Sequence, residues 1–162
     1  MKETITRDAA IPIVDRILDL SREDDADILI CIDCGGGDVK AGLAIYEAIQ
    51  LSPCSVATLC VGKAISMAAL LLACGTPSMR FAFPDARILI HDPIVLKDGA
   101  SNSEGVNLMV DLKQTIDRII CRHTGRSWQQ LQELQGRADG LSAEAACELG
   151  LIDQASREIR II

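Results

Sequence analysis

Strand-like apolar runs alternate with helical patterns along this chain, and that alternation limits the possible folds more than any other feature. "ADILICID" at 26–33 is nearly continuous in apolar residues, which is typical of a strand covered on both faces in a parallel sheet. A glycine turn at 35–37 opens into a helix, and the order repeats with a strand at 55–61, the turn "GKAIS" and a helix at about 66–75. Because this order builds right-handed crossovers, we predict an α/β fold with a mostly parallel sheet.

Further elements extend the same pattern on both sides. A helix with a broad apolar face is predicted at about 9–22, packed on the sheet. Short strands are predicted at 79–83 and 86–91, joined by the tight turn "FPDA". After a polar loop, a long helix is predicted from about 104 to 123.

The last two helices carry local start and stop signals. Ser127 has Gln130 three residues later, which is the spacing of a capping box, and this helix should end near Gly136. Ser142 is the expected cap of a short final helix that Gly150 terminates. With no repeat, low-complexity segment or linker in view, we expect residues 1–162 to form one domain.

Composition narrows the class of protein. The chain has 162 residues, of which 49% are hydrophobic, and this suits one domain with a sizeable core. The net charge is −7 and the basic residues are scattered, so we expect no nucleic-acid partner. The N-terminal sequence has no long apolar stretch, and we therefore expect neither a signal peptide nor a membrane partner, and a cytoplasmic location.

The seven cysteines are an odd number spread through apolar segments, which favours free thiols in a reducing compartment over a disulfide framework. "CIDC" has the spacing of a redox or zinc half-motif. On a strand, however, Cys31 and Cys34 would point to opposite faces, and no second Cys or His pair stands near them. We expect neither a metal nor a cofactor.

Three predicted loops follow the carboxyl ends of strands, where α/β proteins place their functional groups. They hold the glycines at 35–37, Ser66 at the start of an apolar helix, and His91 after "ARILI". Exposed backbone N–H groups, a hydroxyl and an imidazole are the parts of a serine hydrolase. Each has an ordinary alternative as well: a tight turn, a helix cap, and a surface histidine hydrogen-bonded to backbone.

Five segments of the sequence resemble a known family. "ILICIDCGGGDVKAGLAIYEAIQ", "VGKAISMAALLLACG", "RFAFPDARILIHDP", "HTG" and "LSAEAACELGLID" resemble successive segments of ClpP, the proteolytic subunit of the Clp protease, over about 25–153. The resemblance implies the ClpP/crotonase fold, with repeated ββα and βα units and a protruding handle helix. A crotonase-type hydratase shares this fold, but we would not expect it to keep both the serine and the histidine loops.

The resemblance also implies roles for particular residues. It makes Ser66 the nucleophile and His91 the general base, and the N–H groups of Gly37 and Met67 the oxyanion hole. Two departures concern the same site. "CGGG" stands where the family has "SPGG", and the position of the family's catalytic aspartate falls on an alanine.

The triad carboxylate is the weakest match. The family's aspartate falls on Ala138, and the nearest carboxylate is Asp139, which we take as the third member of the triad. Asp92, next to His91, is the fallback, although neighbours on a strand normally face opposite ways. A Ser–Lys dyad that uses Lys63 is a further alternative, but its loop lacks the apolar burial that would lower an ammonium pKa.

The resemblance implies a serine endopeptidase subunit that self-associates into rings and hydrolyses unfolded proteins or peptides through an acyl-enzyme in an oligomeric chamber. The chain starts at what resembles the family's first long helix, so we expect it to lack the N-terminal axial segment. This weighs against docking to an AAA+ unfoldase. The alternative function is that of a catalytically weak or inactive ClpP-like subunit that fills places in a mixed ring, and Ala138 favours it.

Overall fold

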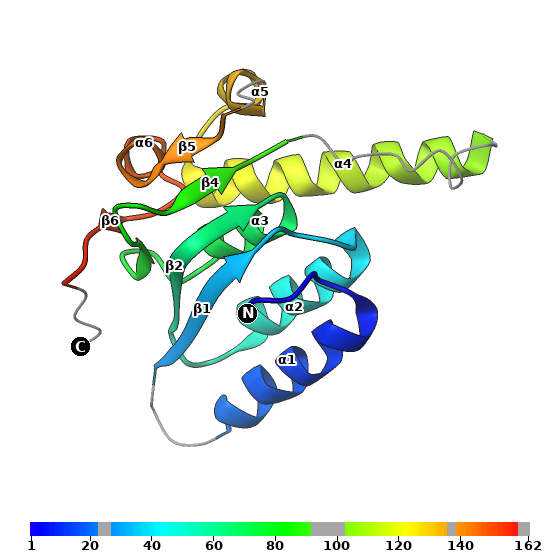
Figure 1. Ribbon diagram of the computed structural model, residues 1–162. Coiled ribbons are helices and arrows are strands. Elements are labelled where there is room, and N and C mark those ends of the chain that lie inside the picture. The colour runs from blue at the N-terminus through cyan, green and yellow to red at the C-terminus, as the bar shows by residue number, and fades with distance from the viewer. Residues whose placement is uncertain (23–26, 92–102, 136–138, 159–162) are drawn as a thin grey trace.

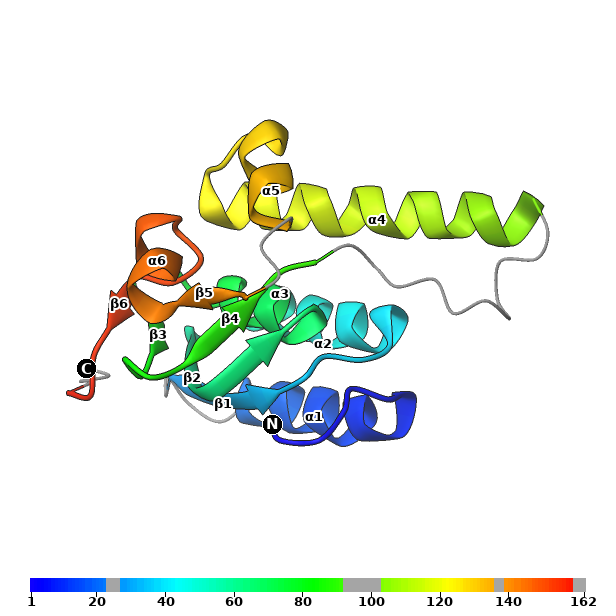
Figure 2. The ribbon, with the colours of Figure 1, turned by 45° about the horizontal axis from the view of Figure 1, so that its top comes forward.

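A computed structural model describes residues 1–22, 27–91, 103–135 and 139–158. It contains one six-stranded sheet with helices, as Figures 1 and 2 show. The predicted α/β class is therefore confirmed. The elements in chain order are α1 (Arg7–Leu20), β1 (Ile28–Cys34), α2 (Val39–Leu51), β2 (Val56–Ile65), α3 (Met67–Ala73), β3 (Arg80–Ala82), β4 (Arg87–Leu89), α4 (Ser103–Thr124), α5 (Trp128–Gln135), β5 (Leu141–Ser142), α6 (Ala143–Glu148) and β6 (Gln154–Ala155).

Strand β2 is the centre of the sheet because three strands pair with it, all in parallel. β1 runs along one side of β2. β3 pairs with the first half of β2, and β4 pairs with the second half. β6 adds in parallel to β3, and only β5 is antiparallel, to β4. The mostly parallel sheet expected from the sequence is confirmed.

The predicted turn "GKAIS" is wrong in its extent, because β2 continues to Ile65. The last three residues of β2, from Lys63 to Ile65, pair in successive register with the three residues of β4, from Arg87 to Leu89. Pairing with a strand more than twenty residues away thus overrides the local glycine signal. The consequence for the site is that Ser66 follows directly on a strand that both neighbours hold in place.

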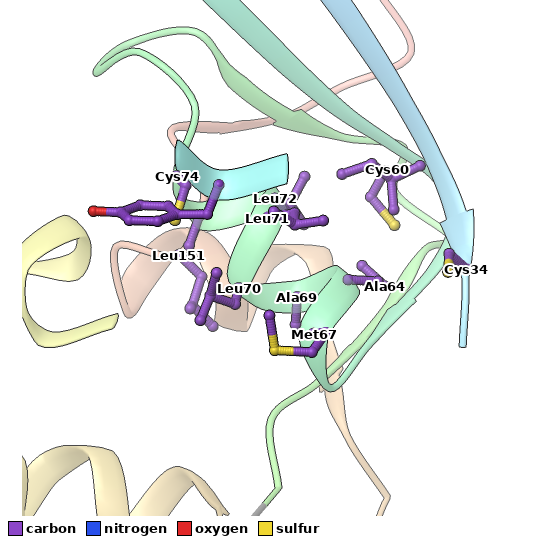
Figure 3. Packing of buried hydrophobic residues seen from close by; sticks show 14 of the residues in the cluster. Cys34, Cys60, Ala64, Met67, Ala69, Leu70, Leu71, Leu72, Cys74 and Leu151 are labelled. Carbon is purple, nitrogen blue, oxygen red and sulfur yellow. The ribbon is translucent and has the colours of Figure 1, made fainter. Parts of the chain in front are cut away.

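Helices α1, α2 and α3 form the layer that covers one face of the sheet (Figure 2). α3 lies at its centre and contacts β1, β2 and β3 as well as α4. All seven of its residues are buried. Figure 3 labels Met67, Ala69, Leu70, Leu71 and Leu72 of α3 in the same buried cluster as Cys34 of β1 and Ala64 of β2. An aliphatic helix that is apolar on every side requires such complete coverage.

The prediction that the first strand is covered on both faces is wrong. β1 was expected to be covered on both faces, yet Leu29 is 44% exposed and Cys31 is also exposed. Their neighbours Ile28 and Ile32 point to the helix layer and are buried, because successive strand side chains alternate between faces. A small second cluster of Ala57, Leu59 and Phe81 is buried elsewhere in the sheet.

The long helix α4 projects beyond the sheet in both views, as the handle helix of the resemblance implied (Figures 1 and 2). Its C-terminal half enters the core through Ile116, Ile119 and Ile120. Leu108 and Val110 in the projecting half are 45% and 48% exposed. No described helix is both long and apolar enough to cross a membrane.

Several local signals are confirmed. The Ser127 N–H donates to Gln130 Oε1 at 3.0 Å, and the Gln130 N–H returns to Ser127 Oγ at 3.4 Å, which is the predicted capping box. Ser142 Oγ accepts the Ala145 N–H at 3.2 Å at the start of α6. The "FPDA" turn is closed by the Ala86 N–H donating to the Phe83 carbonyl at 2.9 Å.

Candidate active site

Ser66 joins β2 to α3 in a backbone conformation that L-residues rarely adopt, with φ 58° and ψ −123°. Ser66 occupies the N-cap position of α3, but its hydroxyl makes no capping hydrogen bond, which counts against the ordinary helix-cap alternative. Its N–H donates to the Leu89 carbonyl at 2.8 Å, which fixes the turn against β4. Strain of this kind costs of order 1–3 kcal/mol and clusters at functional sites, where the surrounding structure holds it in place.

The glycine loop packs directly on this serine turn. Gly36 has φ +88°, and a Cβ added to it would lie 2.6 Å from the Ile65 carbonyl oxygen and 2.9 Å from Ser66 Cβ. The same added atom would be 3.3 Å from the Met67 nitrogen. Only glycine fits in this gap, because L side chains rarely adopt this φ and the added atom would overlap its neighbours.

The two N–H groups that the resemblance assigns to the oxyanion hole, those of Gly37 and Met67, belong to these adjoining segments. The Asp38 N–H donates to the Ile5 carbonyl at 2.7 Å, and the Gly36 carbonyl accepts the Ile5 N–H at 2.9 Å. Since hydrogen-bonding groups alternate along an extended segment, the Gly37 N–H points away from Ile5. Neither this N–H nor that of Met67 donates in any hydrogen bond found within the described residues. Among the described residues, both N–H groups are therefore without an acceptor, as the predicted oxyanion donors require.

His91 follows β4, the strand that pairs with the end of β2. Ile65 is in register with Leu89, so Ser66 is level with Ile90 and His91 is one residue further along. The histidine is half-buried. The pairing of β2 with β4 therefore brings the predicted nucleophile and general base to the same edge of the sheet.

Asp139 lies at the neighbouring end of β5. It is exposed and in a turn, and it precedes Gly140, which has φ +69° and on which an added Cβ would lie 3.1 Å from the Ile88 carbonyl oxygen. Leu141 is opposite Ile88 in the antiparallel pair. Counting back in that register, residue 139 would be opposite Ile90, one residue short of His91. Ala138 and Asp92 lie outside the described residues.

The alternative base Lys63 is exposed on β2. Its N–H donates to Asp33 Oδ1 at 3.2 Å. A lysine that acts as a base needs a desolvated ammonium group, since burial is what lowers its pKa toward neutrality. The exposure of Lys63 therefore counts against a Ser–Lys dyad.

The thiols are free, and burial raises the pKa of two of the buried ones, Cys60 and Cys74. Burial raises the pKa of Cys60 to about 11 against a partial offset from a Gly62 backbone hydrogen bond, and burial also raises the pKa of Cys74. These two thiols therefore stay protonated and are poor nucleophiles. Cys31 is exposed and Cys34 is buried, as expected for opposite faces of a strand. Within the described residues, no group of three or more His, Cys, Asp or Glu side chains is placed to hold a metal ion.

The second histidine, His123 at the end of α4, was not singled out from the sequence. Its ring meets Tyr46 edge-on with centroids 5.9 Å apart, and its Nε2 is buried without a hydrogen-bond partner among the described residues. Burial lowers its pKa, and the positive charges of Arg80 and Arg122 lower it further. The lowered pKa favours the neutral imidazole, and the edge-on contact with Tyr46 makes His123 a packing residue that nothing in the order of residues marked.

The fold is that of an α/β protein, and its sheet brings Ser66 and His91, the nucleophile and base predicted from the sequence, to one edge. The model of the family described as Clp protease matches residues 1–158, so this chain belongs to the Clp protease family, whose members are ClpP-like peptidases. The resemblance read from the sequence is thereby confirmed.

Proposed function

We propose that this protein is a serine endopeptidase subunit that hydrolyses peptide bonds of unfolded proteins or peptides. The observation that carries the proposal is the contact between Gly36 and the strained turn at Ser66 and Met67. A helix cap or a tight turn requires neither the strain at Ser66 nor the close approach of the two segments. Family membership supports the peptidase activity in general terms.

In the proposed reaction, Ser66 Oγ attacks the carbonyl carbon of the scissile bond while His91 accepts the hydroxyl proton. The oxyanion that develops receives hydrogen bonds from the N–H groups of Gly37 and Met67. His91 then gives its proton to the leaving amine as the C–N bond breaks, which leaves an acyl-enzyme on Ser66. A water molecule, deprotonated by His91, hydrolyses that ester and restores both residues.

Asp139 is the proposed partner that orients His91. Its place at the end of β5, next to β4, supports this role, but its exposure and the neighbouring Gly140 leave its geometry weakly fixed. We expect Asp139→Asn to lower turnover of a short peptide by several orders of magnitude, up to about 10⁴, if it completes the triad. If Asp139→Asn turns over peptide at nearly the wild-type rate while Ser66→Ala is inactive, His91 works with another partner or with none.

The second candidate function is that of a structural subunit of a mixed ring, with weak or no catalysis, and Ala138 at the family's aspartate position favours it. Hydrolysis of a short fluorogenic peptide separates the two functions. Ser66→Ala should abolish turnover, and Ser78→Ala is the matched control because Ser78 is the other described non-glycine residue with a positive φ. Equal hydrolysis by wild type and Ser66→Ala would remove the serine-peptidase proposal.

We also propose that the subunit works in a ring-shaped chamber. Exposed aliphatic side chains support self-association, among them Leu51, which is 72% exposed, and Leu29 on the uncovered face of β1. Light scattering at micromolar concentration should give a multiple of the 17.4 kDa chain mass, and a single monomeric species would contradict the proposal. An AAA+ unfoldase is the least supported of the proposed partners. The free thiols suit a reducing compartment, and we propose the cytoplasm.

A further inference from the structure

Cys34 ends β1 two residues before Gly36 and is fully buried. Its sulfur accepts the Gly36 N–H, with nitrogen and sulfur 3.3 Å apart. The thiol proton has two carbonyl oxygens in reach, that of Glu3 at 3.1 Å and that of Gly36 at 3.7 Å. Since a thiol has one proton, the nearer Glu3 carbonyl is the better acceptor.

Glu3, whose carbonyl accepts this hydrogen bond, belongs to a segment that runs along one edge of β1. The Asp33 N–H donates to the Met1 carbonyl at 2.8 Å, and the Ile5 N–H donates to the Gly36 carbonyl at 2.9 Å. Glu3 is midway between these two contacts. The Cys34 thiol therefore joins residues 1–5 on one side to the glycine loop on the other.

We propose that Cys34 is a positioning residue for the oxyanion hole, an inference that rests on the proposed peptidase function. The Gly36 N–H has no acceptor other than Cys34 Sγ among the described residues. With that N–H held, the peptide plane between Gly35 and Gly36 has a fixed direction. The next plane carries the Gly37 N–H, and its Gly36 carbonyl accepts from the Ile5 N–H at 2.9 Å and lies 3.7 Å from Cys34 Sγ. Cys34 therefore holds Gly36, the residue from which the Gly37 N–H is aimed, on its N-terminal side. The Gly36 backbone also packs on Ser66, so the same thiol fixes the distance between donor and nucleophile.

The chemistry of the position allows a sharp test. Cys34→Ala removes both the acceptor for the Gly36 N–H and the donor to Glu3, whereas Cys34→Ser retains one donor and acceptor in a side chain of similar shape. Cys60→Ala is the matched control, since Cys60 is equally buried and lies on the adjacent strand β2. Like Cys34→Ala, Cys60→Ala removes one buried sulfur atom from the core, but the residue it changes is not part of the glycine loop.

Peptide hydrolysis gives the first readout. Cys34→Ala should lower kcat about five- to tenfold with KM changed by less than about twofold, because the lost hydrogen bonds act on the transition-state donor and not on substrate binding. Cys34→Ser should restore most of kcat, and Cys60→Ala should leave it unchanged. A kcat for Cys34→Ala equal to that of Cys60→Ala would overturn the proposal, as would failure of Cys34→Ser to recover activity while it remains folded.

Amide hydrogen exchange gives a readout that does not depend on activity. In the wild type, the peptide covering 34–38 should exchange slowly at Gly36, and Cys34→Ala should speed its exchange at least several-fold relative to Cys60→Ala. If the wild type hydrolyses nothing, the peptidase proposal fails, and exchange still decides whether Cys34 holds the loop. Unchanged exchange in Cys34→Ala would refute the positioning role in either case.

Discussion

Adding one methyl group at Gly36 is the perturbation that most specifically separates the glycine loop from the serine turn. The new Cβ would sit 2.6 Å from the Ile65 carbonyl oxygen and 2.9 Å from Ser66 Cβ, both closer than a real Cβ contact allows. These neighbours are backbone and a short side chain, so neither can swing aside. Gly36→Ala must therefore move the loop away from Ser66 by several tenths of an ångström.

The size of the effect has two parts. An alanine at φ +88° costs roughly 1–2 kcal/mol in backbone strain, to which relief of the contact with Ile65 adds a similar amount. We therefore expect Gly36→Ala to lower the free energy of unfolding by about 2–4 kcal/mol. Because the loop carries the Gly37 N–H, turnover should fall about 10²- to 10³-fold, the loss typical of removing one oxyanion donor.

Gly35→Ala is the matched control, since a Cβ at Gly35 has no atom within 4 Å and its φ is not in the left-handed region. It should keep turnover and stability close to wild type. Urea unfolding and peptide hydrolysis, measured on both variants, make the comparison. The reasoning is refuted if Gly36→Ala remains folded and turns over peptide at the wild-type rate, or if Gly35→Ala is equally damaged.

Two further predictions concern the core around Arg80 and His123. The Arg80 guanidinium binds Asp153 and donates to the His123 and Gly150 carbonyls at 2.9 Å, so Arg80→Met should destabilise the fold by about 3 kcal/mol in urea unfolding. Arg80→Met combined with Asp153→Asn should be less damaging than the two single losses added together, and strict additivity would contradict a coupled pair. The pKa of His123 is lowered chiefly by burial, so the unfolded chain binds a proton more tightly at this residue than the folded chain does. The free energy of unfolding should therefore fall as the pH drops below about 6.5. His123→Phe should flatten that fall, and an unchanged pH profile in this variant would contradict the assignment.

Local signals in the sequence predicted local structure well. The capping box at Ser127 and Gln130, the cap at Ser142 and the "FPDA" turn depend on residues within four positions of one another. They were correct because the interactions that decide them are complete within one turn of chain.

The errors arose where distant pairing decides the structure. β2 runs through Gly62 to Ile65 because β4 pairs with it, and β5 and β6, with two residues each, form strands only through their neighbours. The exposure of Leu29 followed from which face the helices cover, and an apolar run alone does not show this.

For the site, the sequence placed the glycine loop, Ser66 and His91 at strand ends, and the pairing of β2 with β1 and with β4 brings these ends together. The strain at Ser66 and the hydrogen bonds of Cys34 could not be predicted. Both depend on backbone geometry that residues 1–5 and β4 impose from elsewhere in the chain. The spacing of "CIDC" matches half of a metal or redox motif, which we did not expect to be functional, and the positioning role proposed for Cys34 rests on its burial and hydrogen-bond partners.

The central claim is that Ser66 is an activated nucleophile, and reaction with a fluorophosphonate tests it most directly. The reagent should label the folded wild type at one site, and mass spectrometry of the digested protein should place the adduct on Ser66. Ser66→Ala should take up no label, while Ser78→Ala should be labelled like the wild type. Labelling at another residue, or a folded wild type that takes up no label, would contradict the account.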